Sequence, residues 1–124
     1  MWSYVVASGN LSHDGTFVGT GYSGHNDGTQ NGINNSDLEQ VHDIGPVPRG
    51  NWTISPFFDS TEGKGPIVAR LDPNPGTDVF GRAGFMIHGD NAEGARTASH
   101  GCIILARPIR QQIQASGDTD LEVV

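Results

Sequence analysis

The sequence predicts a mainly β fold: a small β-sandwich or barrel-like domain with one short helix. Glycine and proline make up 18 and 7 of the 124 residues, a composition typical of short strands joined by many turns. Apolar residues occur in short segments, and some of these alternate as half-buried strands do. Only one segment has the spacing and end signals of a helix. The length predicts a single domain over residues 1–124.

The N-terminal segment predicts a strand followed by a hairpin. Residues 2–7 alternate, and three apolar side chains share one face of the expected strand: Trp2, Tyr4 and Val6. Asp14-Gly15 lies between two short segments and is a typical two-residue hairpin turn.

The middle of the chain is expected to contain a long loop and several strands. Residues 23–37 include one apolar residue, which predicts a surface loop, either an inert insertion or the wall of a cleft. Further strands are expected at the end of 44–55, at 65–71 and at 102–105, and a last strand closes the chain. The turn-rich segment 72–78 should end the strand before it.

Residues 82–88 are expected to be extended, with their side chains divided between two faces. One face would carry Phe85 and Ile87, and the other Arg82, Gly84, Met86 and His88. The one helix is predicted over residues 107–117, because Pro108 suits its first turn and Gly117 its end.

The charge balance excludes some partners. Fourteen acidic residues against seven basic ones give a net charge of −7, which argues against binding of nucleic acid or anionic lipid. The N-terminus lacks the pattern of a secretory signal, and no apolar segment is long enough to span a bilayer. We therefore expect synthesis in the cytoplasm, and export only by a dedicated apparatus.

Cys102 is the only cysteine, and two interpretations of it are open. Followed by three apolar residues, it suits ordinary core packing, which is favoured when the residue is taken alone. As a nucleophile, it would use Gly101 for a tight turn that exposes main-chain N–H groups to an oxyanion. His88, at the end of a strand, could face the thiol and promote the thiolate.

The neighbours of this pair also have more than one interpretation. His100 could contribute to a cleft, shape the turn or be solvated, and Ser99 could bond within the turn or be an ordinary loop serine. Asp90 and Asn91 could orient His88 or be ordinary polar loop residues. His88, Asp90, His100 and Cys102 are potential zinc ligands, but paired cysteines and a His-x-x-x-His spacing are missing. We therefore expect no metal and no cofactor.

SHGC at 99–102, with the upstream IHGD at 87–90, resembles the catalytic signature of the L,D-transpeptidase (YkuD-type) superfamily. GPVPRGNWTI at 45–54 looks like the Pro-x-Gly-aromatic strand element of that family. The N-terminal 24 residues, FGRAGFMIHGD and ASHGCIIL are similar to a compact subgroup, the L,D-transpeptidase effectors sent into rival bacteria by type VI secretion. The resemblance covers most of the chain.

This resemblance implies a β-sandwich-like catalytic domain with Cys102 as nucleophile and His88 as general base. Ser99, His100 and Gly101 would complete the signature turn, with the N–H groups of Gly101 and Cys102 as the oxyanion donors. Two departures concern the cleft. Only ten residues separate His88 from Ser99, and Ile104 stands where the superfamily often has Asn or Arg.

The resemblance also implies attack on the diaminopimelate–D-alanine bond of peptidoglycan tetrapeptide stems through a thioester. Hydrolysis of this thioester by water would give L,D-carboxypeptidase activity. Attack on it by an amine acceptor would give L,D-transpeptidase activity, which can exchange D-amino acids. The D-alanine carboxylate needs a cation, for which Arg82 is the first candidate and Arg96 the second. Gly89 and Asp90 are further substrate-binding candidates. An immunity protein, type VI secretion components and delivery to the periplasm of a target bacterium are implied too.

Two other functions remain open from the sequence. A catalytically inactive peptidoglycan-binding β module would keep the cleft and leave Cys102 as a packing residue. A cysteine peptidase acting on proteins would cleave casein and leave muropeptides unchanged. The sequence carries no indication of the oligomeric state.

Overall fold

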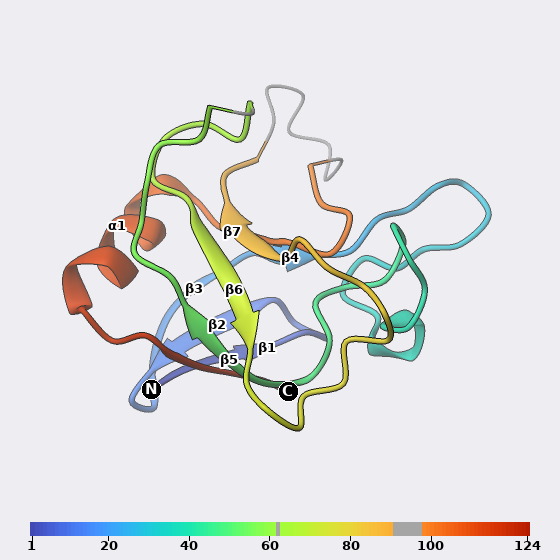
Figure 1. The fold of residues 1–124 in the computed structure, drawn as a ribbon, viewed down its shortest axis with the longest axis horizontal. Helices are drawn as coiled ribbons and strands as arrows, with labels where there is room; N and C mark the ends of the chain where they lie inside the picture. Colours follow the sequence, from blue (N-terminus) through green and yellow to red (C-terminus); the bar gives the residue numbers. More distant parts are fainter. Residues whose placement is uncertain (62, 91–97) are drawn as a thin grey trace.

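The computed structural model describes residues 1–61, 63–90 and 98–124 (Figure 1). Nine strands form a single, nearly closed, barrel-like sheet in the order β3-β2-β1-β9-β5-β6-β7-β8-β4, which confirms the mainly β fold with one short α-helix in the described chain. The strands are β1 (Trp2–Val5), β2 (Asn10–His13), β3 (Thr16–Thr20), β4 (Tyr22–Ser23), β5 (Gly50–Ile54), β6 (Ala69–Pro73), β7 (Met86–His88), β8 (Ile103–Ile104) and β9 (Asp120–Val123).

The first hairpin forms as its sequence predicts. The alternating side chains of Trp2, Tyr4 and Val6 are all buried, at 2%, 0% and 0% exposure. Asp14 and Gly15 both have positive φ, 48° and 85°, as the tight turn between β2 and β3 requires. The residue types in the strand and in the turn therefore favour the same hairpin. The aromatic face of β1 forms part of the main core.

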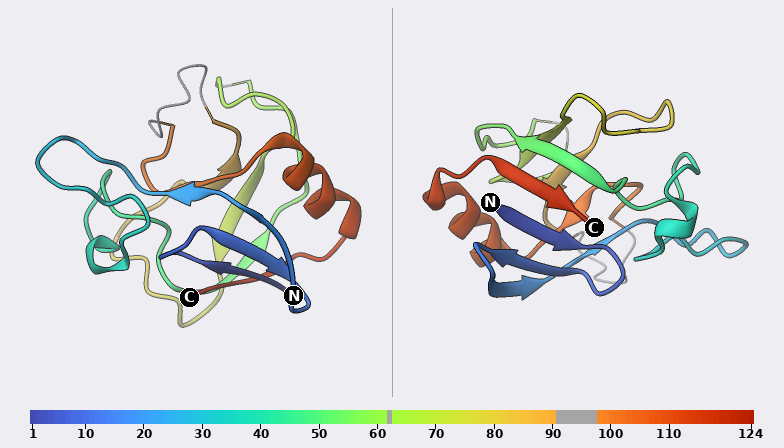
Figure 2. Two further views of the ribbon diagram at one scale, coloured as in Figure 1. Left: turned by 180° about the vertical axis from the view of Figure 1, so that it is seen from behind. Right: turned by 90° about the horizontal axis from the view of Figure 1, so that it is seen from below.

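The C-terminal segment joins the two halves of the sheet. Strand β9 lies between β1, to which it is parallel, and β5, to which it is antiparallel (Figure 2). The helix α1 (Arg107–Ser116) precedes it, with Pro108 in its first turn and Gly117 in the left-handed conformation at its end, φ 67°. The predicted helix is thus confirmed, and its Ile113 is buried in the core.

Strands β7 and β8 run parallel, and this pairing sets the geometry of the candidate site. Ile87 lies beside Ile103, and His88 lies beside Ile104. Ile87 and Ile103 face the main core. Because side chains alternate along a strand, their neighbours point to the other face. There a second, smaller cluster forms from Tyr22, Cys102 and Ile104, with Met86 packed against it.

Two predicted boundaries were wrong. Strand β6 starts at Ala69 and continues through Asp72 and Pro73, which pair with β5, so the turn-rich segment does not end it where expected. Proline is tolerated at that strand end because no further ladder bond is needed there.

The extended segment predicted from residue 82 starts only at Met86. Phe80, Gly81 and Gly84 have positive φ, 56°, 72° and 80°, which interrupts any strand before that point. The alternation that placed Arg82 on one face with His88 therefore does not hold.

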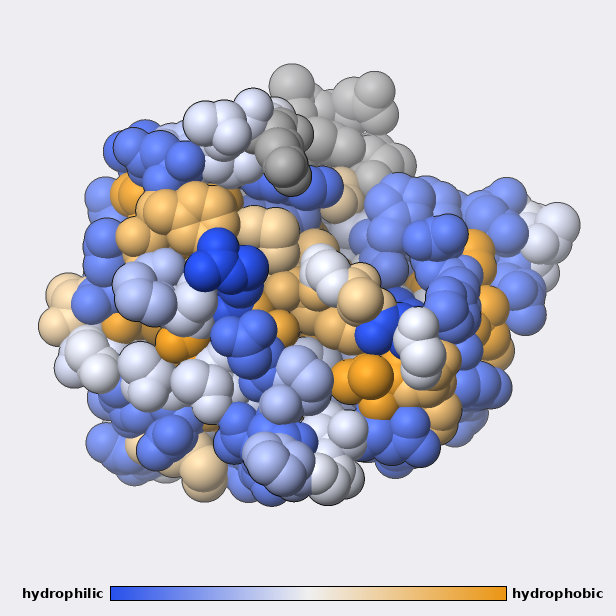
Figure 3. All heavy atoms as spheres, in the orientation of Figure 1, coloured by the Kyte–Doolittle hydropathy of each residue, from blue (hydrophilic) through white to orange (hydrophobic). Residues whose placement is uncertain are grey.

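In the segment 23–37 seven residues are exposed, five are half-buried and three are buried. It contains an isolated pairing of Asn26 with Asn31 and the start of the short 3₁₀-helix η1 (Ser36–Leu38), which confirms a surface loop over most of its length. Its first residue ends β4, and Ile33 packs against the second cluster. On the face seen in Figure 3 the surface is mainly hydrophilic, with hydrophobic side chains in small separate patches. Among the described residues, no helix is long and apolar enough to cross a membrane.

Candidate active site

Cys102 lies in the bend just before β8, with 9% of its surface exposed. Its Sγ is 3.8 Å from the carbonyl oxygen of Gly84. Burial raises the pKa of the thiol above its ordinary value, although the main-chain N–H of Met86 and the charges of Lys64 and Arg82 act in the opposite direction. The resting side chain is therefore a thiol at neutral pH.

The thiol opens into a pocket of about 270 Å³. Three loop segments line it: the turn before β7, residues 81–85; the bend 100–102 with Ala98; and His42 with Asp43. Lys64, from the loop between β5 and β6, completes the wall. The candidate nucleophile thus lines a pocket formed by segments that are far apart in sequence.

His88 ends β7 and is 3% exposed. Its Nδ1 lies 2.8 Å from the carbonyl oxygen of Gly89. A carbonyl can only accept, so Nδ1 carries the proton and Nε2 holds the lone pair of the neutral ring. Burial lowers the pKa of His88, which keeps the ring neutral. The buried Nε2 has no hydrogen-bond partner among the described residues.

The pairing of β7 with β8 brings His88 and Cys102 to one face. Met86 and His88 alternate with Ile87, as Cys102 and Ile104 do with Ile103. Extending the parallel register by one residue places Cys102 beside Met86, which is two residues before His88. The Cα atoms of Cys102 and His88 should therefore lie about 8 Å apart. His88 lines a second pocket of about 140 Å³, which shares Lys64 and Ala98 with the first. The described structure contains no hydrogen bond between the thiol and the imidazole.

Ser99 shapes the bend through its hydroxyl, which is completely buried. The Oγ accepts hydrogen bonds from the N–H groups of Gly24, at 3.0 Å, and Gly101, at 3.1 Å. It donates one to the carbonyl of Cys102 at 2.7 Å. The hydroxyl thus holds the residues around the thiol by main-chain contacts.

Gly101 is required by its surroundings. Its φ is 134°, and a Cβ there would come within 2.5 Å of the Arg82 guanidinium and 3.2 Å of the Phe85 ring. Its N–H already donates to Ser99, so it is not free for an oxyanion in this conformation. The N–H of Cys102 is the remaining main-chain candidate of the two that the family signature implies.

His100 is exposed and lines the pocket of the thiol. Its ring stacks on His25 with the centroids 4.4 Å apart, and its Nδ1 lies 3.2 Å from the carbonyl oxygen of Asp43. The long loop 23–37 therefore contacts a pocket-lining residue through His25. None of its own residues lines either of the two pockets, so both interpretations of this loop stay open.

Arg82, the first candidate for the substrate carboxylate, also lines this pocket, but it is 6% exposed. Its two terminal nitrogens donate to four main-chain carbonyls: those of Glu39, Gly45, Pro46 and His100. The guanidinium joins the 39–46 segment to the bend and packs over the Phe85 ring. Those four N–H groups are not available to a ligand in this conformation. Arg96, the second candidate, lies outside the described residues.

Gly89 and Asp90 continue from His88 and line its pocket. The carbonyl of Gly89 fixes the imidazole, and a Cβ at this position would lie 2.7 Å from the guanidinium of Arg110. Asp90 accepts a 2.8 Å hydrogen bond from the hydroxyl of Tyr22, which in turn accepts one from the N–H of Ala98 at 3.1 Å. Asn91, the other residue considered for orienting His88, lies outside the described residues.

Tyr22 and Lys64 are residues that the sequence analysis missed. Tyr22 ties Asp90 to the start of the 98–102 bend, and Lys64 lines both pockets. Neither lies near the signature motifs in the sequence. Only the strand order, which places β4 beside β8, could have pointed to Tyr22.

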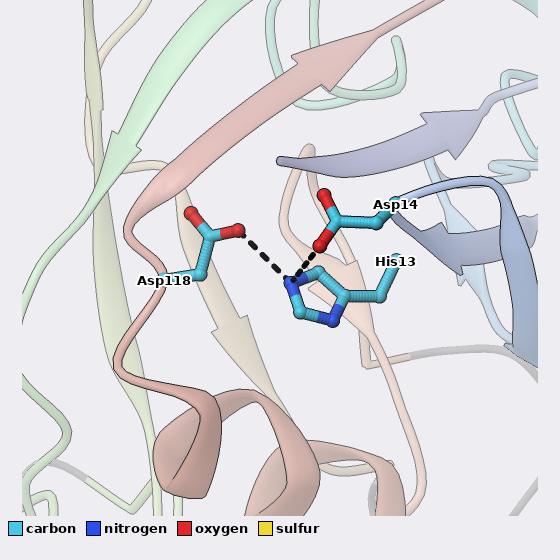
Figure 4. Close-up of side chains that lie close together, drawn as sticks. All are labelled: His13, Asp14 and Asp118. Carbon is cyan, nitrogen blue, oxygen red and sulfur yellow. Dashed lines mark hydrogen bonds and ion pairs between the residues drawn. The ribbon is translucent and has the colours of Figure 1, made fainter.

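The potential zinc ligands near Cys102 do not form a metal-binding group within the described chain. The one group there with suitable spacing is His13, Asp14 and Asp118, shown in Figure 4. The Nε2 of His13 is 2.9 Å from Asp118 and 3.7 Å from Asp14. Both carboxylates also pair with the Met1 amino group, Asp118 at 2.7 Å and Asp14 at 2.6 Å. These ion pairs account for the cluster without a metal, and none of its members lines the two pockets.

Comparison with known proteins gives one family. The family model described as the Tlde1 domain matches residues 18–122, which run from within β3 to within β9 and include every element of the candidate site. A search of curated proteins found no match. Since the model covers most of the chain, the protein belongs to the Tlde1 domain family, a family of L,D-transpeptidase effectors of type VI secretion.

Proposed function

We propose that this protein is a peptidoglycan-modifying cysteine enzyme that attacks the diaminopimelate–D-alanine bond of tetrapeptide stems. The observation that carries the proposal is the placement of Cys102 and His88 on one face of two adjacent parallel strands, each opening into one of two adjoining pockets. Membership of the Tlde1 family supports the same chemistry.

The first half of the reaction starts from two neutral groups. The Nε2 of His88 takes the thiol proton, directly or through one water, as Sγ bonds to the diaminopimelate carbonyl carbon. The Nδ1–H bond to Gly89 leaves that lone pair free and steadies the ring as it becomes charged. The tetrahedral oxyanion meets the N–H of Cys102. His88 then gives the proton to the D-alanine nitrogen, the C–N bond breaks, and a thioester remains.

The second half releases the acyl group from Cys102. His88, neutral again, takes a proton from a water or an acceptor amine as that molecule attacks the thioester carbonyl, and returns the proton to the sulfur. Water gives a tripeptide and L,D-carboxypeptidase activity. An amine, from a second diaminopimelate or a free D-amino acid, gives L,D-transpeptidase activity. The outcome depends on how well the bound stem excludes water from the two pockets.

The biological setting that we propose is antibacterial. The family supports a role as a type VI secretion effector that acts on peptidoglycan in the periplasm of a target bacterium. Such a protein requires secretion components to carry it, and an immunity protein to protect the cell that produces it.

The test is a muropeptide digest with wild-type protein and Cys102→Ala. We expect the wild type to remove D-alanine from tetrapeptides of Gram-negative sacculi, or to exchange it for an added D-amino acid, with both products read by mass spectrometry. The Cys102→Ala variant should lose at least about a thousand-fold in rate, because the nucleophile is gone. Unchanged muropeptides with the wild-type protein would contradict the proposal.

A catalytically inactive peptidoglycan-binding module is the second candidate. It is favoured by the burial of Cys102, which raises the pKa of the thiol, and by the lack of a hydrogen bond between this thiol and His88 in the described structure. Such a module would bind sacculi equally well with Cys102 or alanine, and would leave the muropeptides unchanged.

A further inference from the structure

A stem that ends in D-alanine, the substrate of the proposed function, would bring a free carboxylate to the pocket of the thiol. The main cation candidate, Arg82, has four of its N–H groups on main-chain carbonyls and supports the bend at Gly101. Turning that guanidinium toward a ligand would leave buried carbonyls unpaired, which is costly. Another side chain must therefore neutralise the carboxylate.

The other charged groups around the site leave one choice among the described residues. Arg49 is bound to Glu39, and Arg110 donates to the carbonyls of Leu105, Pro66 and Ile67. Of the lysine and arginine side chains described, only Lys64 and Arg82 line the pocket of the thiol, and only Lys64 lines the pocket of His88 as well.

Lys64 is presented for binding by its loop. It lies between Gly63 and Gly65, both with positive φ, in a turn that the hydrogen bond from the N–H of Ser60 to the carbonyl of Gly65 closes. The loop stands at the same end of the barrel as the C-terminal end of β7 (Figure 1). Lys64 is exposed, and its ammonium has no hydrogen bond or ion pair with any described residue. Its three N–H donors are therefore available.

We propose that Lys64 is the specificity-determining residue of the site and binds the free carboxylate of the terminal residue of the stem, beside Cys102. The proposal rests on the proposed function for the identity of the substrate. It deepens that function, because it makes the enzyme selective for stems that end in a free carboxylate next to the scissile bond. Lys64 also lowers the pKa of both Cys102 and His88, in keeping with its position between the two pockets.

The experiment compares two substrates on four proteins. The substrates are a disaccharide tetrapeptide with a free terminal carboxylate and the same compound with a terminal carboxamide. The proteins are the wild type, Lys64→Met, Lys64→Arg and Arg107→Met. The last removes the same charge from an exposed helix position that lines neither pocket. The readout is the ratio of kcat/KM for acid over amide, in which any general effect of Lys64 on the thiol cancels.

We expect the wild type to prefer the acid by about ten- to hundred-fold, the range for a hydrogen bond to a charged group. The preference should lie mainly in KM. It should fall to near one in Lys64→Met, remain largely intact in Lys64→Arg and be unchanged in Arg107→Met. An acid preference in Lys64→Met equal to that of the wild type would overturn the proposal, while the proposed function would stand.

A binding measurement separates the remaining outcomes. Calorimetric titration of Cys102→Ala, with and without Lys64→Met, gives the affinities for acid and amide without turnover. If the wild type turns over neither compound, the proposed function fails, and an acid preference in binding that is lost with Lys64→Met still supports the role of Lys64. Equal affinities for acid and amide, or no binding of either, would overturn that role.

Discussion

At the scale of single residues, burial shifts the pKa values of the two groups of the candidate site in opposite directions. It raises that of Cys102 and lowers that of His88, so both are uncharged at rest. A thiolate–imidazolium pair is therefore not the resting state. The proton must move to His88 as the substrate is attacked, which makes the free Nε2 lone pair the essential feature of the ring.

The lowered pKa of His88 predicts how stability depends on pH. In the unfolded chain the imidazole of His88 binds a proton at about pH 6.5, and in the folded chain it binds one only at lower pH. The contribution of His88 is therefore fully present above pH 6.5 and is lost as the pH falls, with a slope of at most about 1.4 kcal/mol per pH unit. In His88→Gln the free energy of unfolding should depend less on pH over this range.

Denaturant unfolding from pH 8 to pH 5 measures this effect. The free energies of unfolding of the wild type and His88→Gln should run parallel above about pH 7 and converge, or cross, below pH 6.5. A constant difference over the whole range would show that His88 has an ordinary pKa in the folded protein.

At the scale of elements, α1 contacts the residue that follows β7, Gly89, through its Arg110. Its Ile113 is 2% exposed in the main core. Its Arg110 donates to the carbonyl of Leu105, just after β8, and to two carbonyls of the segment before β6. The same guanidinium lies against Gly89, whose carbonyl holds the ring of His88. The position of α1 is thus coupled to the orientation of the imidazole.

Truncation of Ile113 should weaken the packing of α1. Ile113→Ala is expected to lower the free energy of unfolding by about 2–5 kcal/mol, because it removes buried methyl groups and leaves a cavity under α1. The exposed neighbour provides the control: Gln112→Ala should change stability by less than about 0.5 kcal/mol. Guanidinium unfolding curves measure both, and equal losses would show that α1 contributes little to the core.

At the scale of the whole molecule, one sheet carries both ends of the chain and the strands beside the two pockets. The parallel pair of β1 and β9 closes the sheet between the first hairpin and the rest, while β7 and β8 carry the candidate site. The net charge of −7 favours solubility. The pocket of the thiol differs from this overall balance, because Lys64 and Arg82 line it together with a single acidic residue of the described chain, Asp43.

The proposed setting predicts where the protein is harmful. Expression in a Gram-negative recipient with an added periplasmic signal should reduce viability, because only that compartment contains the peptidoglycan substrate. The same protein without the signal, and periplasmic Cys102→Ala, should both be tolerated. Colony counts after induction measure the effect, and equal toxicity in the two compartments would count against a peptidoglycan substrate.

The sequence by itself determined the features that depend on local chemistry. The alternation in residues 2–7, the Asp14-Gly15 turn and the end signals of α1 lie within short segments, so backbone preferences and burial of one face were sufficient. It also indicated Cys102 and His88 as the pair to examine, through the residues around them.

The tertiary structure alone decided which side chains are free to act. Arg82 has a structural role because it donates to four carbonyls of segments distant in sequence. Lys64 is available to bind a ligand because its loop lies beside both pockets. In the same way, the strand order brought Tyr22 to Asp90, and the hydroxyl of Ser99 took the N–H of Gly101. Hydrogen-bond partners and burial depend on contacts between residues far apart in sequence, and no local pattern specifies them.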